Sequence, residues 1–241
     1  MLFEKVTVVI TATDESESLI ETVETIASTC DMSDIDSFMV VIPKNAHSEC
    51  LAAIDFLKGK YSDKVRKLVQ RNPYIGGALR DSVDETTSSH IMFLSADIPT
   101  NLESFPIMID RAKKKPDTII KISRWLEKNS FYGYNKSKKA VNFLGQKFLK
   151  FLFNSKLTDF TSPVLIAPTE IYKKINFREW NFPCLLEAVL IPLRAGYRFE
   201  EIAAKCYSRK EGKSKNSAWQ TMMYLKTAFR VRFTRKSDLL K

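Results

Sequence analysis

The chain has 241 residues, of which 38 are Lys or Arg and 28 are Asp or Glu, and 44% are hydrophobic. This composition predicts a folded globular protein with a sizeable core and argues against wholesale disorder. No apolar run reaches the ~20 residues of a membrane-spanning helix, and a content of two histidines, His47 and His90, nearly excludes zinc sites and histidine-based catalytic triads.

Apolar runs alternate with helical patterns along the chain. The predicted strands lie at residues 6–10, 38–42, 65–69, 91–94, 118–123, 163–167 and 198–204. The expected helices follow the strands and include residues 102–113, 138–153, 183–195 and a helical tail. This alternation is typical of an α/β fold with a mostly parallel sheet flanked by helices. Such sheets bind ligands beyond the carboxyl ends of their strands, which here are Thr11–Glu15, Ile42–Asn45, Asn72–Gly77 and Ser95–Asp97.

The positive charge is concentrated in two stretches. Residues 205–241 carry eleven Lys or Arg and two acidic residues, and residues 132–156 carry six lysines and no acidic residue. Apolar residues recur at helical spacing between the basic ones, as Val141, Leu144 and Phe148 do. Such a stretch can be the solvated face of a core helix, can contact nucleic-acid phosphates, or can lie on an anionic membrane surface. The many large aromatic residues favour the membrane surface, and we expect no nucleic-acid partner.

Seven short motifs resemble one family of enzymes. Val6–Glu15 (VTVVITATDE) resembles the opening strand of the family 2 glycosyltransferases of GT-A fold, Asn72–Arg80 (NPYIGGALR) resembles their N-x-G-x-G-x-A-L stretch, and Phe93–Ile98 (FLSADI) stands where they carry the metal-binding DxD. The other four motifs resemble the dolichyl- and undecaprenyl-phosphate sugar synthases of this family: Ser123–Trp125 (SRW), Asp159–Ser162 (DFTS), Leu193–Arg198 (LRAGYR) and Arg209–Lys215 (RKEGKSK).

The resemblance implies a GT-A (Rossmann-like) domain over residues 1–216, followed by a basic amphipathic helix at residues 217–241. It also implies an inverting glycosyltransferase that moves a sugar from a nucleotide-diphosphate sugar to a polyprenyl phosphate at a membrane surface. Attachment would be peripheral or through a separate membrane protein, with the enzyme in the cytoplasm at the inner face of the membrane. The four cysteines form no CxxC pair and are expected to be free thiols of a reducing compartment.

The resemblance also assigns candidate site residues. Those for the donor nucleotide are Thr11, Ala12, Thr13, Glu15, Gly76 and Asp97, and those for the acceptor phosphate are Arg124, Lys138, Asn142, Arg209, Ser214 and Lys215. Asp97 is the predicted ligand of a divalent cation, Mg²⁺ or Mn²⁺, which would stabilise the departing diphosphate, and it is therefore a candidate catalytic residue. Arginine and lysine side chains are expected to anchor the acceptor phosphate.

The chain departs from the family pattern at the donor site. Ser95 replaces the first aspartate of the DxD motif, which removes one charge from the metal site. Residues 42–45 lack the carboxylate with which the family reads the nucleotide base. The sequence therefore leaves both the base and the dependence on metal open.

Two other functions remain open at this point. A glycosyltransferase that acts on a saccharide hydroxyl needs a general base, and Asp159 is the candidate for that catalytic role. Alternatively, the lost carboxylates favour a degenerate, non-catalytic GT-A module that binds a partner or a sugar nucleotide without turnover.

Overall fold

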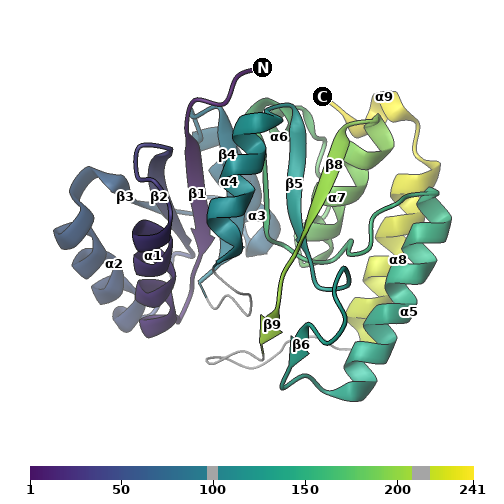
Figure 1. Ribbon diagram of the computed structural model, residues 1–241, viewed down its shortest axis with the longest axis horizontal. Coiled ribbons are helices and arrows are strands. Elements are labelled where there is room, and N and C mark those ends of the chain that lie inside the picture. The colour runs from purple at the N-terminus through teal and green to yellow at the C-terminus, as the bar shows by residue number, and fades with distance from the viewer. Residues whose placement is uncertain (97–102, 208–217) are drawn as a thin grey trace.

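The computed structural model describes residues 1–96, 103–207 and 218–241 (Figure 1). Its centre is a seven-stranded sheet in the order β3-β2-β1-β4-β7-β5-β8. The strands of this sheet are β1 (Val6–Thr11), β2 (Ile35–Ile42), β3 (Val65–Val69), β4 (His90–Ser95), β5 (Thr118–Ser123), β7 (Leu165–Pro168) and β8 (Arg198–Ala203). Six strands run in one direction, and β7 is antiparallel to both of its neighbours. The mostly parallel sheet expected from the sequence is confirmed, and each of the seven predicted strands is present.

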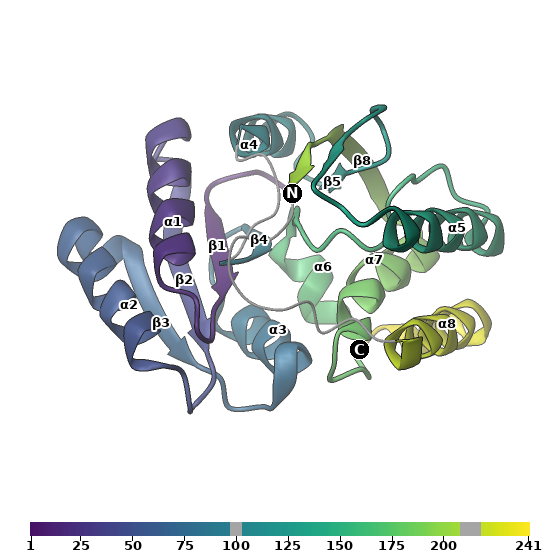
Figure 2. The same cartoon turned by 90° about the horizontal axis from the view of Figure 1, so that it is seen from below.

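Helices cover both faces of the sheet, and their apolar sides form two hydrophobic clusters (Figure 2). One face packs against α1 (Glu17–Thr29), α2 (Ser48–Tyr61) and α4 (Ser104–Lys114). The other face packs against α3 (Tyr74–Glu85), α6 (Thr169–Lys174) and α7 (Pro183–Ala195). Because both faces are buried, successive residues of a strand are apolar: in β1, Val8 and Ile10 join the first cluster while Val9 joins the second.

Two long helices run side by side along one flank of the molecule, α5 (Lys136–Phe153) and α8 (Ala218–Phe233) (Figures 1 and 2). The shorter elements are β6 (Phe131–Tyr132), β9 (Cys206–Tyr207), η1 (Ser62–Lys64) and α9 (Lys236–Leu239). Strands β6 and β9 pair as a separate two-stranded sheet below the main one. Among the described helices, none combines the length and the apolarity that crossing a membrane requires.

The basic C-terminal helix α8 is packed into the second hydrophobic cluster. Ala228 and Val231 of α8 are fully buried there. On the side of α5, the rings of Phe148 and Phe229 lie 5.7 Å apart between centroids. Arg230 forms an ion pair with Glu187, a fully buried residue of α7. The helix thus shares a core with the sheet, and the domain boundary expected at residue 216 stays a prediction.

Candidate active site

Three strand ends meet at one edge of the sheet and form the donor side of the candidate site. In the parallel register, Thr11 at the end of β1 pairs with Val41 of β2 and with Ser95 of β4. The pairing continues past the strands: the amide of Ala12 donates to the carbonyl oxygen of Val41 at 3.0 Å, and the amide of Ala96 donates to that of Thr11 at 3.0 Å. The fold therefore brings Thr11, Ala12 and Ser95 together, as the motif positions predict.

The loop after β1 is shaped by Glu15. Oε2 of Glu15 accepts hydrogen bonds from the amide of Thr13 at 2.7 Å and from the amide of Asp14 at 3.2 Å. On the other side of the loop, the carbonyl oxygen of Thr13 accepts from the amide of His47 at 3.0 Å. In the described structure Glu15 thus stabilises its own turn, and the expected donor contacts of Thr13 and Glu15 stay predictions.

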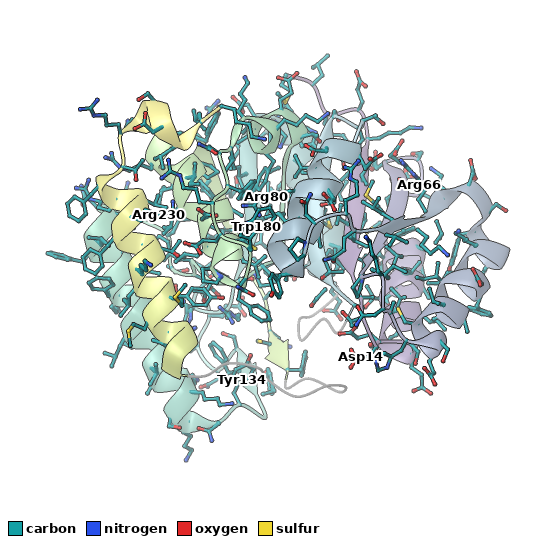
Figure 3. All side chains as sticks on the ribbon, turned by 180° about the vertical axis from the view of Figure 1, so that it is seen from behind. Asp14, Arg66, Arg80, Tyr134, Trp180 and Arg230 are labelled. Atoms are coloured by element: carbon teal, nitrogen blue, oxygen red, sulfur yellow. The ribbon has the colours of Figure 1, made fainter. Side chains whose placement is uncertain are left out.

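Gly76 lies where the backbone of another loop approaches the start of α3. Its amide donates to the carbonyl oxygen of Trp180 at 2.7 Å, and an added Cβ would lie 2.6 Å from the carbonyl oxygens of both Glu179 and Trp180. Arg80 fixes the same loop, because its guanidinium stacks 4.0 Å from the centre of the Trp180 ring (Figure 3). Glycine is therefore required here for packing, and the expected contact of Gly76 with the nucleotide stays a prediction.

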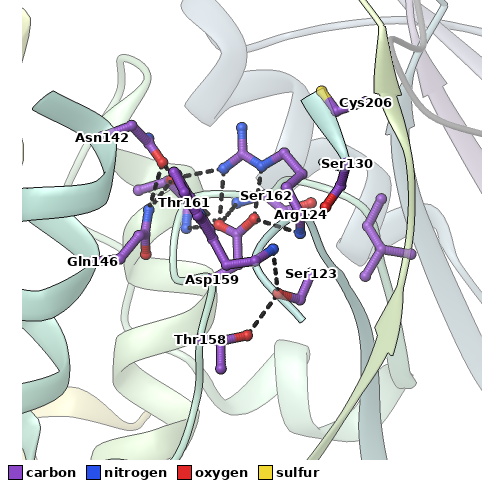
Figure 4. Close-up of polar contacts among 12 residues, drawn as sticks. Ser123, Arg124, Ser130, Asn142, Gln146, Thr158, Asp159, Thr161, Ser162 and Cys206 are labelled. Carbon is purple, nitrogen blue, oxygen red and sulfur yellow. Dashed lines mark hydrogen bonds and ion pairs between the residues drawn. The ribbon is translucent and has the colours of Figure 1, made fainter. Parts of the chain in front are cut away.

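On the acceptor side, Arg124 follows β5 and binds Asp159 through two parallel hydrogen bonds (Figure 4). Nε of Arg124 donates to Oδ2 of Asp159 at 2.6 Å and Nη2 donates to Oδ1 at 2.8 Å. The amides of Thr161 and Ser162 also donate to Oδ1, at 3.1 and 3.0 Å. Asp159 is fully buried and the Arg124 side chain is 13% exposed. Paired groups of this geometry form strong, directional contacts.

This pairing shifts the pKa of both partners. Burial alone would raise the pKa of the Asp159 carboxyl, but the positive charge and the hydrogen bonds of Arg124 outweigh it and lower that pKa below its ordinary value of 3.8. Burial alone would lower the pKa of Arg124, yet Asp159 raises it. Asp159 is consequently a weak proton acceptor whose two oxygens are occupied. The general-base role expected for a saccharide acceptor stays a prediction, and this environment does not favour it.

Two side chains of α5, Gln146 and Asn142, extend the polar network around the ion pair. Arg124 Nη2 donates to the hydroxyl of Thr161 at 2.9 Å, and Nε2 of Gln146 donates to the same hydroxyl at 2.8 Å. Asn142 donates to it from Nδ2 at 3.3 Å. Oδ1 of Asn142 in turn accepts from the indole Nε1 of Trp125 at 3.0 Å. The predicted acceptor residues Arg124 and Asn142 are thus brought together through Thr161.

A cavity of about 420 Å³ opens beside this network, between α5, α7 and α8. Arg124, Lys138 and Asn142, which are three of the predicted acceptor-phosphate residues, all line it. Its apolar lining consists of Phe131, Val141, Leu149, Leu186 and Leu225. The volume is in the range of ordinary small-molecule sites, and a charged wall next to an apolar one suits an amphiphilic ligand.

Part of the predicted site lies outside the described residues, namely Asp97, Arg209, Ser214 and Lys215. Within residues 1–96, 103–207 and 218–241, no group of three or more His, Cys, Asp or Glu side chains is arranged to hold a metal ion. Ser95, at the end of β4, brings a hydroxyl where the family motif has a carboxylate. The described residues therefore do not form a metal site by themselves.

The model of the family described as glycosyl transferase family 2 matches residues 7–200 of the chain. The chain belongs to this family. As a family 2 glycosyltransferase it is an enzyme that uses a nucleotide-sugar donor.

Solved structures with the same fold include glucosyl-3-phosphoglycerate synthase from Mycobacterium tuberculosis. Its complex with Mn²⁺, uridine-diphosphate-glucose and phosphoglyceric acid matches this glycosyltransferase with a TM-score of 0.74 and 13% identity, over 97% of this chain and 82% of that chain. Its complex with phosphoglyceric acid matches with a TM-score of 0.74 and 14% identity, over 97% of this chain and 82% of that chain. The complex with Mn²⁺, uridine-diphosphate and phosphoglyceric acid matches with a TM-score of 0.71 and 13% identity, over 97% of this chain and 80% of that chain. At these identities the similarity shows the fold, and the GT-A architecture is confirmed.

Three residues on the predicted acceptor side of the site were not identified from the sequence: Lys121, Gln146 and Glu201. Gln146 stands four positions after Asn142, so the two share one face of a helix, and this spacing was the available signal. Lys121 interrupts an otherwise apolar strand and is fully buried in β5. Glu201 stands beside it in β8. A charge inside a buried strand is costly unless it is paired, which was the signal for Lys121.

Proposed function

We propose that this glycosyltransferase transfers a sugar, with inversion, from a nucleotide-diphosphate sugar to a polyprenyl phosphate at an anionic membrane surface. The composition of the cavity beside α5 carries the proposal. Arg124, Lys138 and Asn142 suit a phosphate group, while Leu149 and Leu186 on the apolar side suit the start of a prenyl chain. Phosphoglyceric acid, which the structural neighbour binds, has no apolar chain, so it would leave the apolar side of the cavity without a contact.

The chemistry of a phosphate acceptor also suits a site in which the candidate base, Asp159, is held in an ion pair. The phosphate oxygen of the acceptor is an anionic nucleophile that attacks the anomeric carbon, and the electron pair of the broken bond leaves with the nucleoside diphosphate. No proton has to be removed, so Asp159, with its lowered pKa, can serve to hold Arg124. A divalent cation at Asp97 belongs to the proposal, and when bound it would act as a Lewis acid for the departing diphosphate.

The outer surface of α5 and α8 supports the membrane part of the proposal. Apolar side chains are exposed along both helices: Val141, Leu144 and Phe151 on α5, and Met222, Phe229 and Phe233 on α8. Neither helix contains an acidic residue, whereas α5 alone carries five lysines. An apolar stripe flanked by positive charge matches the interface of a bilayer with anionic head groups. The cavity opens between these same helices, so a prenyl chain anchored in the bilayer can reach it.

The proposal includes a peripheral enzyme at the inner, cytoplasmic face of the membrane, held by lipid or by a separate membrane protein. The donor is a nucleotide-diphosphate sugar, and its base stays open because residues 42–45 lack the carboxylate with which the family reads the base. Uridine nucleotides are the first to test, because the structural neighbour binds uridine-diphosphate and uridine-diphosphate-glucose.

The test is transfer from a panel of labelled nucleotide sugars to undecaprenyl or dolichyl phosphate in phosphatidylglycerol vesicles. Phosphoglyceric acid and a soluble oligosaccharide are offered in parallel reactions. We expect label in the lipid fraction with one donor and none in the soluble acceptors. Label on the oligosaccharide without lipid would support the saccharide-hydroxyl reaction instead, and no transfer from any donor would support the binding module.

Dependence on metal is tested separately at Ser95. The Ser95→Asp variant restores the carboxylate of the family motif, and Ser95→Asn serves as the uncharged control of similar size. We expect Ser95→Asp to strengthen the Mn²⁺ dependence of transfer, because a second carboxylate increases the charge available to the cation. Equal rates with and without a chelator in both variants would remove the cation from the proposal.

A further inference from the structure

Glu201 holds the backbone of the loop that carries Asp159, although it lines no part of the cavity. It lies in β8, and its Oε1 accepts from the amide of Asp159 at 2.9 Å. Its Oε2 accepts from the amide of Thr158 at 2.7 Å and from the hydroxyl of Thr158 at 2.9 Å. A single carboxylate therefore fixes two consecutive peptide groups, and hydrogen bonds to a charged acceptor are the stronger kind.

Lys121 fixes the next peptide group along the chain, which contains the carbonyl of Asp159. It pairs with Glu201 in the register of β5 and β8, and its fully buried Nζ donates to the carbonyl oxygen of Asp159. A second bond runs from this Nζ to the carbonyl oxygen of Ile122 at 3.2 Å. The amide and the carbonyl of Asp159 are thus both bound by charged side chains from the sheet, which leaves the residue a single position.

The position of Asp159 determines that of Arg124. Both oxygens of the Asp159 carboxylate accept from Arg124, and Arg124 is the cavity residue at the centre of the polar network (Figure 4). The chain of contacts runs from Glu201 through the peptide of Asp159 to the guanidinium. By formal charge, Lys121 and Arg124 balance the buried Asp159 and the half-buried Glu201.

We propose that Glu201 is a positioning residue that sets the guanidinium of Arg124 for the acceptor phosphate without touching the acceptor. This inference rests on the proposed use of Arg124 as a phosphate anchor. It assigns a functional consequence to a residue in the edge strand of the sheet, which reaches the site through the amides of Thr158 and Asp159 and the hydroxyl of Thr158.

The experiment compares the full chain with its Glu201→Gln and Glu200→Gln variants. Glu200 is the matched control, because it is the adjacent residue of the same strand and its carboxylate pairs with Lys115 and Arg111 outside the cavity. The glutamine amide at position 201 would place a donor group against backbone amides, which releases at least one of them. Thr158→Val is a milder variant that removes the hydroxyl, with its contacts to Glu201 and Ser123, and leaves both peptide groups intact.

Two measurements separate positioning from simple support of the fold. The first is the rate at which phenylglyoxal modifies Arg124, read by peptide mass spectrometry. The second is the KM for farnesyl phosphate, a short soluble acceptor, together with the KM for the sugar nucleotide. We expect Glu201→Gln to increase the modification rate several-fold and to raise the acceptor KM on the order of tenfold, with the donor KM unchanged. Thr158→Val should increase the modification rate and the acceptor KM to a smaller extent, and Glu200→Gln should change neither of them.

An unchanged modification rate in Glu201→Gln and Thr158→Val would overturn the inference, whatever the acceptor. A faster modification with an unchanged acceptor KM would overturn it as well, since Arg124 would have moved without consequence. If the unmutated enzyme does not use farnesyl phosphate or longer prenyl phosphates, the proposed function fails. The modification rates then still decide whether Glu201 positions Arg124.

Discussion

The donor and acceptor sides of this site are built in different ways. On the donor side the predicted residues are held mainly by the backbone, as in the hydrogen bond between Ala12 and Val41 and the close approach of Trp180 to Gly76. On the acceptor side they are held by side chains, with Arg124 and Asp159 at the centre. A site held by the backbone tolerates the exchange of side chains, whereas a buried polar network depends on each of its members.

This difference explains where the sequence keeps to the family pattern and where it departs from it. Ser95 changes a motif at the end of a strand whose position is fixed by its register with β1, so the fold survives the loss of a carboxylate. Asp159 has no such freedom, because its loss would leave Arg124 with its charge buried and unpaired. The predictions below test whether the two sides differ in this way.

The largest effect is expected for Asp159→Asn. Removing one partner of a buried ion pair leaves an uncompensated charge, which typically costs about 3–5 kcal/mol of the free energy of unfolding. Urea unfolding followed by circular dichroism measures the loss. Asp110→Asn is the control, because Asp110 pairs with Lys114 on the exposed side of α4 and should change little. A loss in Asp159→Asn no larger than in the control would contradict the buried network.

A smaller loss is expected on the donor side, for Gly76→Ala. The new Cβ would lie 2.6 Å from two backbone oxygens, and displacing them should cost about 1–3 kcal/mol. Gly59→Ala is its counterpart in α2, where an added Cβ meets nothing within 4 Å. There the free energy of unfolding should rise by roughly 0.5–1 kcal/mol, since alanine is the better helix former. The midpoint of thermal unfolding should therefore fall in Gly76→Ala and rise in Gly59→Ala. Equal changes of the midpoint in the two variants would refute the packing role of Gly76.

The loss of the free energy of unfolding at low pH should depend in part on Asp159. Its pKa in the folded enzyme lies below the ordinary value of 3.8, so the unfolded chain takes up a proton first as the pH falls. The stabilisation is complete above about pH 5 and is lost as the pH drops through and below that ordinary value, with a slope of at most about 1.4 kcal/mol per pH unit. Unfolding measured between pH 5 and pH 3 should be less steep in Asp159→Asn than in the unmutated enzyme. If the free energy of unfolding fell equally with pH in both proteins, groups other than Asp159 would cause the acid sensitivity.

The smallest effect is expected for Lys138→Gln, which removes an exposed charge from the wall of the cavity. We expect the KM for a prenyl phosphate to increase about two- to fivefold, because exposed charges contribute little in water. Lys150→Gln changes another exposed lysine of α5 that does not line the cavity, and it should leave this KM unchanged. A similar increase in both variants would mean that the helix attracts the acceptor by its total charge.

The sequence was sufficient for most of the fold because the signals involved are local. Each strand is a short apolar run, and a parallel sheet places the carboxyl ends of strands such as β1 and β4 at one edge. The missed elements are too short to have a pattern: β6 and β9 have two residues each. The packing of α8 was missed because its buried residues, such as Ala228 and Val231, alternate with basic residues such as Lys226 and Arg230.

The same distinction holds within the site. Arg124 and Asn142 were found through motifs, and they line one cavity. Glu201 and Lys121 act through a pairing between β5 and β8, whose residues are far apart in sequence. Lys121 is marked locally as a charge within an apolar strand, but no local pattern marks Glu201 or shows what either residue binds. Their partner is the backbone of residue 159, which is the same for every amino acid. A contact of this kind becomes visible only in three dimensions.

Trp125, whose indole donates a hydrogen bond to Asn142, can serve as an intrinsic fluorescence probe of the cavity. The indole is half-buried, and its ring lies 4.7 Å from Phe131 and 5.2 Å from Phe143 between centroids. Because Phe131 and Asn142 line the cavity, an occupant would alter the surroundings of this fluorophore. Trp180, stacked on Arg80, can be replaced by phenylalanine to reduce the background emission. Unlabelled prenyl phosphates can then be titrated by intrinsic fluorescence, before the sugar or its nucleotide is known.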